Sequence, residues 1–354
     1  ATLGKMVCDV LNYSRKKLTV RLGELTQVNS YVRRIIMNNI FSNYPKEKYG
    51  IAKYSIGIYQ NNETSLYNYD NQEIYDIASI TKLFTLKILY DLQKEHKLDL
   101  NTKITSYLKL ANLDKDTTIL DLIKMKDTIR TDKKLSDTKN KKEFLNILFT
   151  AKIEKKNVPK YNDLGFCLLG ILIEEITQKS LRENFQELFQ KLGLKNTCVN
   201  PSNQYKIYGN GDNDYSPHDL KTRVAGGLTG AAGIFSNVSD LLQVGKLLIE
   251  EKFFDKEFLI DIFKYNFIDQ KKRNRTYAGL YKYTEDYKCY VPKSYSKYSL
   301  AHQGYTGATL IVDLKKKAVN VLLFDAILKD TKEKGKNFFD GYYKLQEITA
   351  NVIL

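Results

Sequence analysis

The chain has no tryptophan and only five prolines and four cysteines among its 354 residues. The cysteines, at positions 8, 167, 198 and 289, include no Cys-x-x-Cys pair, which argues against a zinc knuckle, a thioredoxin motif and a dense disulfide framework. Neither a Gly-x-Gly-x-x-Gly sequence nor a Walker sequence occurs, so we predict no nucleotide-binding loop. We therefore expect a protein that uses no metal and no cofactor.

Long apolar runs are also missing. No segment approaches the roughly 18 consecutive apolar residues of a membrane-spanning helix, and the N-terminus lacks the charged, then apolar, then small-residue order of a signal peptide. Apolar residues nevertheless make up 43% of the chain, too many for a disordered protein. At roughly 150 residues per domain, the length predicts two domains or one interleaved unit, with no integral membrane span.

The chain is basic, with 56 Lys and Arg against 41 Asp and Glu and a formal net charge of +15. Such a surplus attracts phosphate polymers, nucleic acids among them. The lysines are spread along the whole chain, however, and no nucleic-acid-binding motif is present. We expect no nucleic-acid partner. Compositional drift and attraction of an anionic envelope polymer both remain open as explanations of the charge.

Residues that favour strands gather at both ends of the chain. Residues 51–60 are followed by two asparagines and a second β-rich stretch, which is the pattern of a hairpin. Residues 307–313 and 318–325 flank a short turn in the same way. These stretches predict one antiparallel sheet assembled from both ends of the chain, and a final helix over about 332–354.

The middle of the chain has helical periodicity. Apolar residues lie nearly all round a helix over 79–95 and again over 164–177, so we expect both helices to be buried. A third helix, over 239–251, is amphipathic, and either Ser236 or Ser239 is its expected N-cap. These segments predict a mostly helical region between the strands.

Together the elements predict an α/β (α+β) fold class. We expect an antiparallel sheet domain from residues 1–75 and 270–354, flanked by N- and C-terminal helices. Residues 76–269 are expected to form a mostly helical domain inserted into it. The expected place of the active site is the cleft between the two domains.

Ser79 and Lys82 form a Ser-x-x-Lys sequence at the start of the first buried helix. Three residues make about one helical turn, so the hydroxyl and the amine lie on the same face. A serine hydroxyl becomes a nucleophile when a neighbouring base takes its proton, and apolar burial lowers a lysine pKa toward that role. The ordinary alternative is a helix N-cap at Ser79 and a lysine that extends to solvent.

Further motifs follow in a fixed order. Residues 74–108 carry the Ser-x-x-Lys sequence, residues 161–170 read YNDLGFCLLG, residues 218–242 are rich in glycine, and His-Gln-Gly stands at 302–304. In this order the chain resembles the serine penicillin-binding-protein and β-lactamase superfamily, in its class C-like and esterase-like branch, over about residues 45–325. The resemblance implies a β-lactamase/transpeptidase-like fold and a metal-free serine hydrolase.

The resemblance also implies catalytic roles. Ser79 is the nucleophile that becomes acylated, and Lys82 is its partner. Tyr161 shares the acid and base work, which requires neighbouring cations because a phenol has an ordinary pKa of about 10. Lys82 and, if protonated, His302 are the cations expected beside it. In a chain with 26 tyrosines, packing is the ordinary alternative for Tyr161, as a structural role is for His302.

Substrate-holding groups follow from the same resemblance. The backbone N–H groups of Ser79 and Tyr305 are expected to form the oxyanion hole, where donors face the developing negative charge. Gly304 is expected to be small so that strand and substrate approach closely. Asp163 is expected to orient Lys82 or a substrate amide.

Three departures from the family pattern bear on the substrate. Gln303 stands where peptidases and β-lactamases have Thr or Ser, and His302 stands where they have Lys, which weakens the site for a substrate carboxylate at neutral pH. Residues 124–130 replace a family segment at one wall of the cleft. Of the other histidines, His96 is expected at the surface and His218 in a loop, where a secondary role in the pocket stays open.

The expected function is that of a serine acyl hydrolase, an esterase or a D-amino-acid peptidase or esterase, with weak β-lactamase activity. Its substrate would be a small-molecule or peptidoglycan-like ester or amide of the cell envelope. The alternative is a non-hydrolytic penicillin- or cell-wall-binding protein, which has no need to keep Ser79, Lys82 and Tyr161. Since most members of the superfamily act outside the cytoplasmic membrane, the resemblance implies an extracytoplasmic location.

Overall fold

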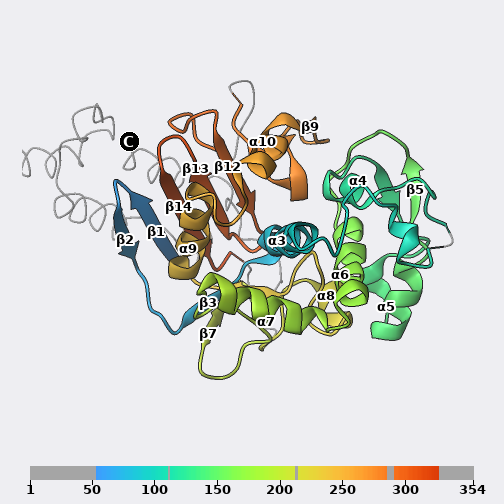
Figure 1. Cartoon of the computed structure of the whole chain (residues 1–354). Coiled ribbons are helices and arrows are strands. Elements are labelled where there is room, and N and C mark those ends of the chain that lie inside the picture. Colours follow the sequence, from blue (N-terminus) through green and yellow to red (C-terminus); the bar gives the residue numbers. More distant parts are fainter. Residues whose placement is uncertain (1–52, 111, 212–213, 285–290, 327–354) are drawn as a thin grey trace, which may run out of the picture.

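The computed structural model describes residues 53–110, 112–211, 214–284 and 291–326 (Figure 1). A large antiparallel sheet occupies one side of the molecule, and most of the helices lie beside it. The expected N- and C-terminal helices, including the one over 332–354, lie outside the described residues. In the described part, no helix combines the length and the apolar character needed to cross a membrane.

The large sheet has eight strands, and the two ends of the described chain meet inside it. In spatial order the strands are β2 (Glu63–Tyr67), β1 (Tyr54–Gln60), β14 (Ala318–Phe324), β13 (Thr309–Asp313), β12 (Ser299–Gln303), β11 (Tyr281–Lys282), β10 (Asn274–Arg275) and β9 (Phe267–Ile268). β1 and β14 pair antiparallel, with Tyr54 opposite Phe324. The prediction of one sheet from both ends of the chain is confirmed.

Both predicted hairpins are present. β1 and β2 are joined at Asn61 and Asn62, whose φ angles of 53° and 62° lie in the left-handed region. Asparagine tolerates this region better than most residues, which suits it to a tight turn. β13 and β14 pair in the same way, with Asp313 opposite Ala318.

Helix α3 (Thr81–Lys94) passes through the middle of the molecule. It packs against the helices on one side and lies beside the large sheet on the other, and every residue from Thr81 to Tyr90 is buried (Figure 1). This explains its nearly uniform apolar character, because it has no solvent face over these turns. The helices that contact α3 are α6 (Leu164–Thr177) and α7 (Leu181–Leu192), and the other helices of this region are α4 (Ile119–Ile123), α5 (Lys141–Leu148) and α8 (Leu220–Val224).

Two small sheets lie within the mostly helical region. One has four strands in the order β6 (Cys198–Val199), β8 (Ile234–Ser236), β3 (Glu73–Asp76) and β7 (Lys206–Tyr208), and the other pairs β4 (Thr128–Arg130) with β5 (Lys152–Lys155). The sequence did not indicate these strands. β3 matters most for function, because it leads directly into a 3₁₀ turn, Ala78–Ile80, that contains Ser79.

Helix α9 (Val238–Ile249) covers the large sheet, where it packs on β1, β13 and β14, and α10 (Lys256–Lys264) follows it. The N-cap of α9 is Asn237, whose side-chain oxygen accepts a hydrogen bond from the backbone N–H of Asp240 at 3.0 Å. The prediction of Ser236 or Ser239 at this position was wrong. α9 precedes residue 270 yet packs on the sheet. The division of the chain into two domains at that residue therefore remains a prediction.

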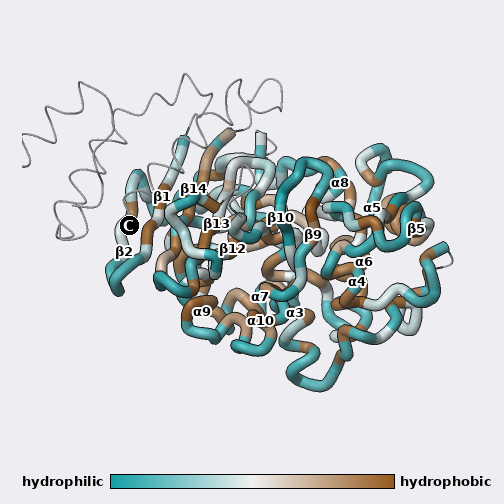
Figure 2. The backbone as a smooth tube through the Cα atoms, turned by 90° about the horizontal axis from the view of Figure 1, so that it is seen from above, coloured by the Kyte–Doolittle hydropathy of each residue, from teal (hydrophilic) through white to brown (hydrophobic). Residues whose placement is uncertain are grey.

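The apolar core is continuous from the sheet to the helices. Figure 2 shows hydrophobic segments along the inner strands and α9, and hydrophilic segments along the outer turns. Phe84 of α3 stands edge-on to Phe189 of α7, with ring centroids 5.7 Å apart, and to Phe253, which follows α9. These rings join the elements on both sides of α3 into one packed body.

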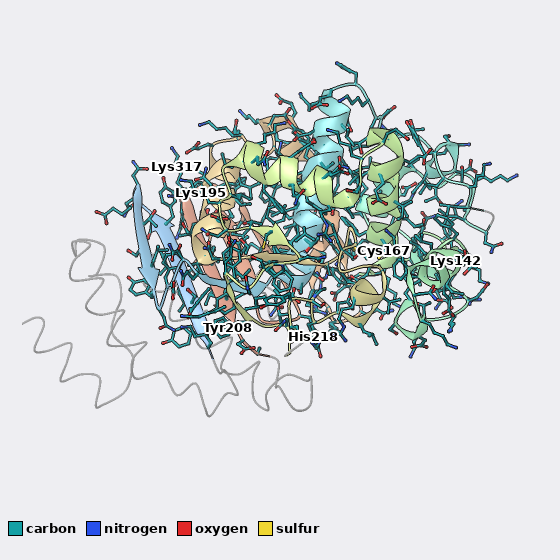
Figure 3. The ribbon with its side chains drawn as sticks, turned by 90° about the horizontal axis from the view of Figure 1, so that it is seen from below. Lys142, Cys167, Lys195, Tyr208, His218 and Lys317 are labelled. Carbon is teal, nitrogen blue, oxygen red and sulfur yellow. The ribbon has the colours of Figure 1, made fainter. Side chains whose placement is uncertain are left out.

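Basic side chains are spread over the surface. Figure 3 shows Lys317 and Lys195 at one end of the molecule, Lys142 at the other, and His218 between them on a further face. All three lysines are exposed. These three lysines therefore do not belong to one basic face.

Candidate active site

Ser79 lies in the 3₁₀ turn between β3 and α3, at the bottom of a cleft. The side chain of Lys82, one turn further on, donates a hydrogen bond from Nζ to Ser79 Oγ at 3.0 Å. The expected spacing therefore does bring hydroxyl and amine into contact. Ser79 is not a helix cap, and Lys82 does not extend to solvent, because its side chain is fully buried.

Lys82 is surrounded by acceptors. Its Nζ lies 2.7 Å from Asp163 Oδ1 and donates to the carbonyl oxygen of Ala231 at 3.3 Å. Burial alone would lower the pKa of Lys82, but the charge of Asp163 and the Tyr161 phenol outweigh it, so the pKa is raised. The expectation of a pKa lowered by apolar surroundings was wrong, because a carboxylate faces the amine. Lys82 is an ammonium in the resting site.

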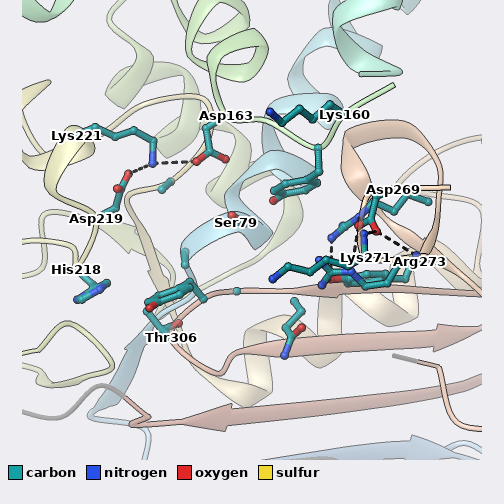
Figure 4. A pocket seen from close by; sticks show the side chains of 18 of the residues that line it. Ser79, Lys160, Asp163, His218, Asp219, Lys221, Asp269, Lys271, Arg273 and Thr306 are labelled. Carbon is teal, nitrogen blue, oxygen red and sulfur yellow. Dashed lines mark hydrogen bonds and ion pairs between the residues drawn. The ribbon is translucent and has the colours of Figure 1, made fainter. Parts of the chain in front are cut away.

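Asp163 links Lys82 to a second lysine. Its Oδ2 lies 2.9 Å from Lys221 Nζ, which is also 2.8 Å from Asp219 Oδ2 (Figure 4). Burial alone would raise the pKa of Asp163, but Lys82 and Lys221 hold it well below its ordinary value. Burial likewise opposes the charge on Lys221, and the two carboxylates raise its pKa. The four side chains form a chain of alternating charges.

Tyr161 is held between two cations. Lys82 Nζ lies 5.0 Å from the centre of its ring, and the Arg275 guanidinium lies 4.2 Å from it. Arg275 is 3% exposed and is oriented by Asp269, whose Oδ2 is 2.6 Å from its Nε, and by Tyr281, whose hydroxyl is 2.9 Å from its Nη2. A cation that the sequence did not indicate therefore stands beside Tyr161.

His302 does not supply the second cation. It is 1% exposed, and its Nε2 lies 3.1 Å from the carbonyl oxygen of Ala278. Burial, together with the nearby charges of Lys82 and Arg275, lowers the pKa of His302 to about 3, so the imidazole is neutral. Its side chain faces a small apolar cavity behind β12 and is absent from the cleft lining. The structural alternative for His302 describes it better than a role beside the substrate.

The next residues of the same strand do reach the cleft. Successive side chains of a strand point to opposite faces, so Gln303 lines the cleft where His302 does not. A Cβ atom on Gly304 would lie only 2.5 Å from the carbonyl oxygen of Ile77, two residues before the nucleophile. Gly304 therefore allows the end of β12 to lie directly against the Ser79 turn. Tyr305 follows at the cleft wall, with its side chain 56% exposed.

A buried carboxylate that the sequence did not indicate ties the cleft walls together. Asp76 Oδ1 accepts from the backbone N–H of Ala78 at 2.8 Å, and its Oδ2 accepts from the backbone N–H of His218 at 2.7 Å. The Thr306 hydroxyl donates to the Asp76 carbonyl oxygen at 2.6 Å. Burial, against the two backbone hydrogen bonds, raises the pKa of Asp76 to about 7. The His218 ring then stacks on Tyr305, with centroids 5.6 Å apart.

The cleft has a volume of about 750 Å³ and lies between the end of β12, the 217–223 segment and the 269–275 segment (Figure 4). Of the predicted residues, Ser79, Tyr161, Asp163, Gly304 and Tyr305 line it, Lys82 lies beneath Ser79, and His302 is set back behind the strand. Among the described residues, no group of three or more His, Cys, Asp or Glu side chains is arranged to hold a metal ion.

The sequence model of the Beta-lactamase family matches residues 37–334. The chain belongs to the Beta-lactamase family. Teichoic acid D-alanine hydrolase of Staphylococcus aureus is 26% identical to it over 230 residues, which is 63% of this chain and 56% of the relative. The protein of that name from strain MRSA252 is 24% identical over 277 residues, or 72% of this chain and 68% of the relative. The chain thus spans little more than half the length of the first relative.

Solved structures of the Beta-lactamase family share the fold. A class C beta-lactamase in complex with cefoxitin superposes with a TM-score of 0.69 at 15% identity and covers 91% of this chain and 100% of its own. FmtA from Staphylococcus aureus superposes with a TM-score of 0.65 at 20% identity, over 96% of this chain and 93% of its own. These superpositions confirm the predicted fold class, and the family model confirms the predicted family.

Several residues that shape the cleft of this Beta-lactamase family chain were not predicted from the sequence. Lys221 lies in the glycine-rich segment that carried the resemblance, so its position offered a signal that was not used. Arg275 and Asp76 stand in no recognisable pattern, because their roles depend on partners brought by other elements. His218 occupies the cleft wall, where a secondary role had been left open.

Proposed function

We propose that this chain is a serine hydrolase that forms an acyl-enzyme on Ser79 and cleaves esters. The observation that carries the proposal is the contact between Lys82 Nζ and Ser79 Oγ, 3.0 Å long, at the bottom of an open cleft. A nucleophile and its partner within hydrogen-bond distance are the signature of covalent catalysis. A protein that only binds envelope polymers has no use for this pair, which disfavours the non-hydrolytic alternative.

The charge states suggest how the proton moves. Because Lys82 is already an ammonium in the resting site and cannot accept a proton, we assign transfer of the Ser79 proton to the oxygen of Tyr161 in its phenolate form, with Lys82 and Arg275 as the cations beside it. Ser79 Oγ attacks the carbonyl carbon, and the backbone N–H groups of Ser79 and Tyr305 are the proposed oxyanion donors. The leaving alcohol takes the proton back from Tyr161. Water then cleaves the acyl ester by the reverse sequence.

The proposed substrate is an ester of D-alanine, or of a similar small acyl group, on an anionic envelope polymer. Support comes from the relative of 26% identity, which is named for hydrolysis of D-alanine on teichoic acid. The buried, neutral His302 and the uncharged Gln303 place no cation at the third motif for a substrate carboxylate. This favours an ester over a peptide or a β-lactam. Such a substrate places the enzyme outside the cytoplasmic membrane.

A Ser79→Ala variant tests the proposal. We expect the wild type to hydrolyse p-nitrophenyl acetate and to release D-alanine from D-alanylated lipoteichoic acid, and the variant to lose both activities by a factor of about 10³ or more. Ser202→Ala, at an exposed serine, is the matched control and should retain full activity. Penicillin labelling of Ser79 without turnover of either ester would favour the non-hydrolytic alternative instead.

A further inference from the structure

We propose that Lys160 and Lys271 form an anion subsite that binds phosphate groups of the substrate on the leaving-group side of the cleft. The inference rests on the proposed ester hydrolysis and adds what the leaving alcohol carries, namely phosphodiesters. The cleft lining carries an excess of positive charge. The carboxylates there are Asp163, Asp219 and Asp269, and the cations are Lys160, Lys221, Arg223, Lys271, Arg273 and Arg275, a formal surplus of three positive charges.

Half of these cations are already paired with a carboxylate. Lys221 lies between Asp163 and Asp219, and Arg273 and Arg275 both contact Asp269. Among the described residues, neither Lys160 nor Lys271 has a carboxylate oxygen within 4.0 Å. Together with Arg223, which is hydrogen-bonded to the carbonyl oxygen of Pro217, these two amines are the cations of the lining that a bound anion can neutralise without breaking an ion pair.

Both lysines line the same cleft as Tyr161, the proposed proton donor. Lys160 directly precedes Tyr161 in the chain, and in Figure 4 the side chains of Lys160 and Lys271 extend into the cleft from two different segments. Tyr161 returns a proton to the leaving alcohol, so this alcohol must come close to it. Phosphates attached to the alcohol would then lie beside Lys160 and Lys271.

The backbone of both lysines is held in place. Asp269 Oδ1 accepts from the backbone N–H of Lys271 at 2.8 Å, and Asp269 is itself fixed by Arg275 at 2.6 Å. The backbone N–H of Lys160 donates to the carbonyl oxygen of Met125 at 3.2 Å. When an anion binds here, only the two side chains lose conformational entropy, because the backbone segments that carry them are already ordered.

The opposite wall has a different chemistry. His218 and Tyr305 stack there, and the Leu220 side chain is 48% exposed beside them. Arg223 of the same segment donates from Nη1 to the carbonyl oxygen of Pro217 at 3.3 Å and acts on the buried Asp76, so this wall offers a phosphate less than the two lysines do. The two walls therefore favour one orientation, with the polymer along Lys160 and Lys271 and the acyl group toward Tyr305. In a chain with 56 Lys and Arg, the ordinary alternative is that both lysines are only part of a solvated rim.

The test compares two double variants with the same change in net charge. One is Lys160→Gln with Lys271→Gln, and the control is Lys195→Gln with Lys317→Gln, whose lysines do not line the cleft and lie away from His218 (Figure 3). Substrates are D-alanylated lipoteichoic acid, a phosphodiester polymer, and the neutral p-nitrophenyl acetate. At low salt we expect the cleft double to raise KM for the polymer about tenfold more than it changes KM for the acetate.

The control double should change KM for the polymer less than twofold. Equal shifts in KM for the polymer in both double variants would show that only the overall charge matters. If the ratio of the KM values for polymer and acetate were unchanged in the cleft double, the proposed subsite would be wrong. Binding of polymer stripped of its esters, measured in a Ser79→Ala background, tests the subsite without catalysis. If the wild type hydrolyses neither ester, the proposed function fails, while weaker binding in the cleft double alone still supports the subsite.

Discussion

At the scale of single residues, the charge of each cleft group is set by the partners that the fold brings to it. Lys82 keeps its proton because Asp163 faces it, and His302 loses its proton because it is buried beside Lys82 and Arg275. The first outcome opposes the prediction from the sequence, in which burial lowers the pKa of Lys82. The second excludes the role that His302 would have had beside Tyr161 if it were protonated. The positive field at Tyr161 thus comes from Lys82 and Arg275.

The neutral state of His302 predicts a loss of stability in acid. Its pKa is about 3 in the fold and 6.5 in the unfolded chain, so between these values the unfolded chain binds a proton that the folded chain does not. The contribution of His302 to stability therefore falls as the pH drops below 6.5, by about 2 kcal/mol between pH 6.5 and pH 5, while protonation of Asp76, whose pKa is raised to about 7, favours the fold over the same range. In urea unfolding, His302→Gln should therefore gain stability relative to the wild type as the pH falls.

His96→Gln provides the control for this measurement, because His96 is exposed and the substitution is the same. Its acid dependence should match that of the wild type. If His302→Gln kept the full wild-type dependence on pH, the assignment of a neutral, buried imidazole would be wrong.

Gly304 predicts a steric effect on catalysis. In Gly304→Ala the new methyl group would meet the Ile77 carbonyl oxygen at 2.5 Å and the Ile77 carbonyl carbon at 3.1 Å, and neither backbone atom can move without shifting the Ser79 turn. We expect ester hydrolysis to fall by about 10²-fold and stability by about 1–3 kcal/mol. Gly165→Ala is the control, since its Cβ would meet only ordinary contacts at 3.6 Å. Similar kcat/KM values for both variants would contradict the close approach.

At the scale of elements, the predictions succeeded where a pattern ran over many residues. The helix over 164–177 was predicted to the residue, and the two hairpins were found from their β-rich runs and turns. The strands of the small sheets and β9 to β11 were missed. They span only two to four residues each, too short for an alternation of apolar and polar side chains to be recognised.

The N-cap of α9 offers a direct test at this scale. Asn237→Ala removes the acceptor that the backbone N–H of Asp240 uses, so we expect the variant to lose about 1 kcal/mol of unfolding free energy. Ser239→Ala, at the serine expected from the sequence, should change it by less than about 0.5 kcal/mol. Thermal unfolding followed by circular dichroism compares the two. A larger loss of unfolding free energy in Ser239→Ala than in Asn237→Ala would support Ser239 as the N-cap instead.

At the scale of the whole molecule, the cleft depends on strands from both ends of the described chain. β14 lies between β1 and β13, and β13 in turn supports β12, which ends at Gly304. A chain that ends at Lys317 keeps every predicted site residue but lacks β14. We expect this truncated chain to lose its folded circular dichroism spectrum and its hydrolysis of p-nitrophenyl acetate.

The full-length chain with Lys315→Ser, at an exposed turn position near the truncation point, is the control and should fold and hydrolyse the acetate normally. Hydrolysis by the truncated chain at the wild-type rate would mean that the helical region builds the reactive Ser79 without the sheet. That result would contradict the dependence of the cleft on β12.

The sequence by itself determined the family, the order of the motifs and the nucleophile candidate. These depend on residues close together in the chain, such as Ser79 and Lys82 one helical turn apart, or on long runs of periodic apolar residues. Only the tertiary structure decided the charge states and the far walls of the cleft. Arg275 reaches Tyr161, and Asp76 reaches His218, across long stretches of chain, and local patterns carry no information about such contacts.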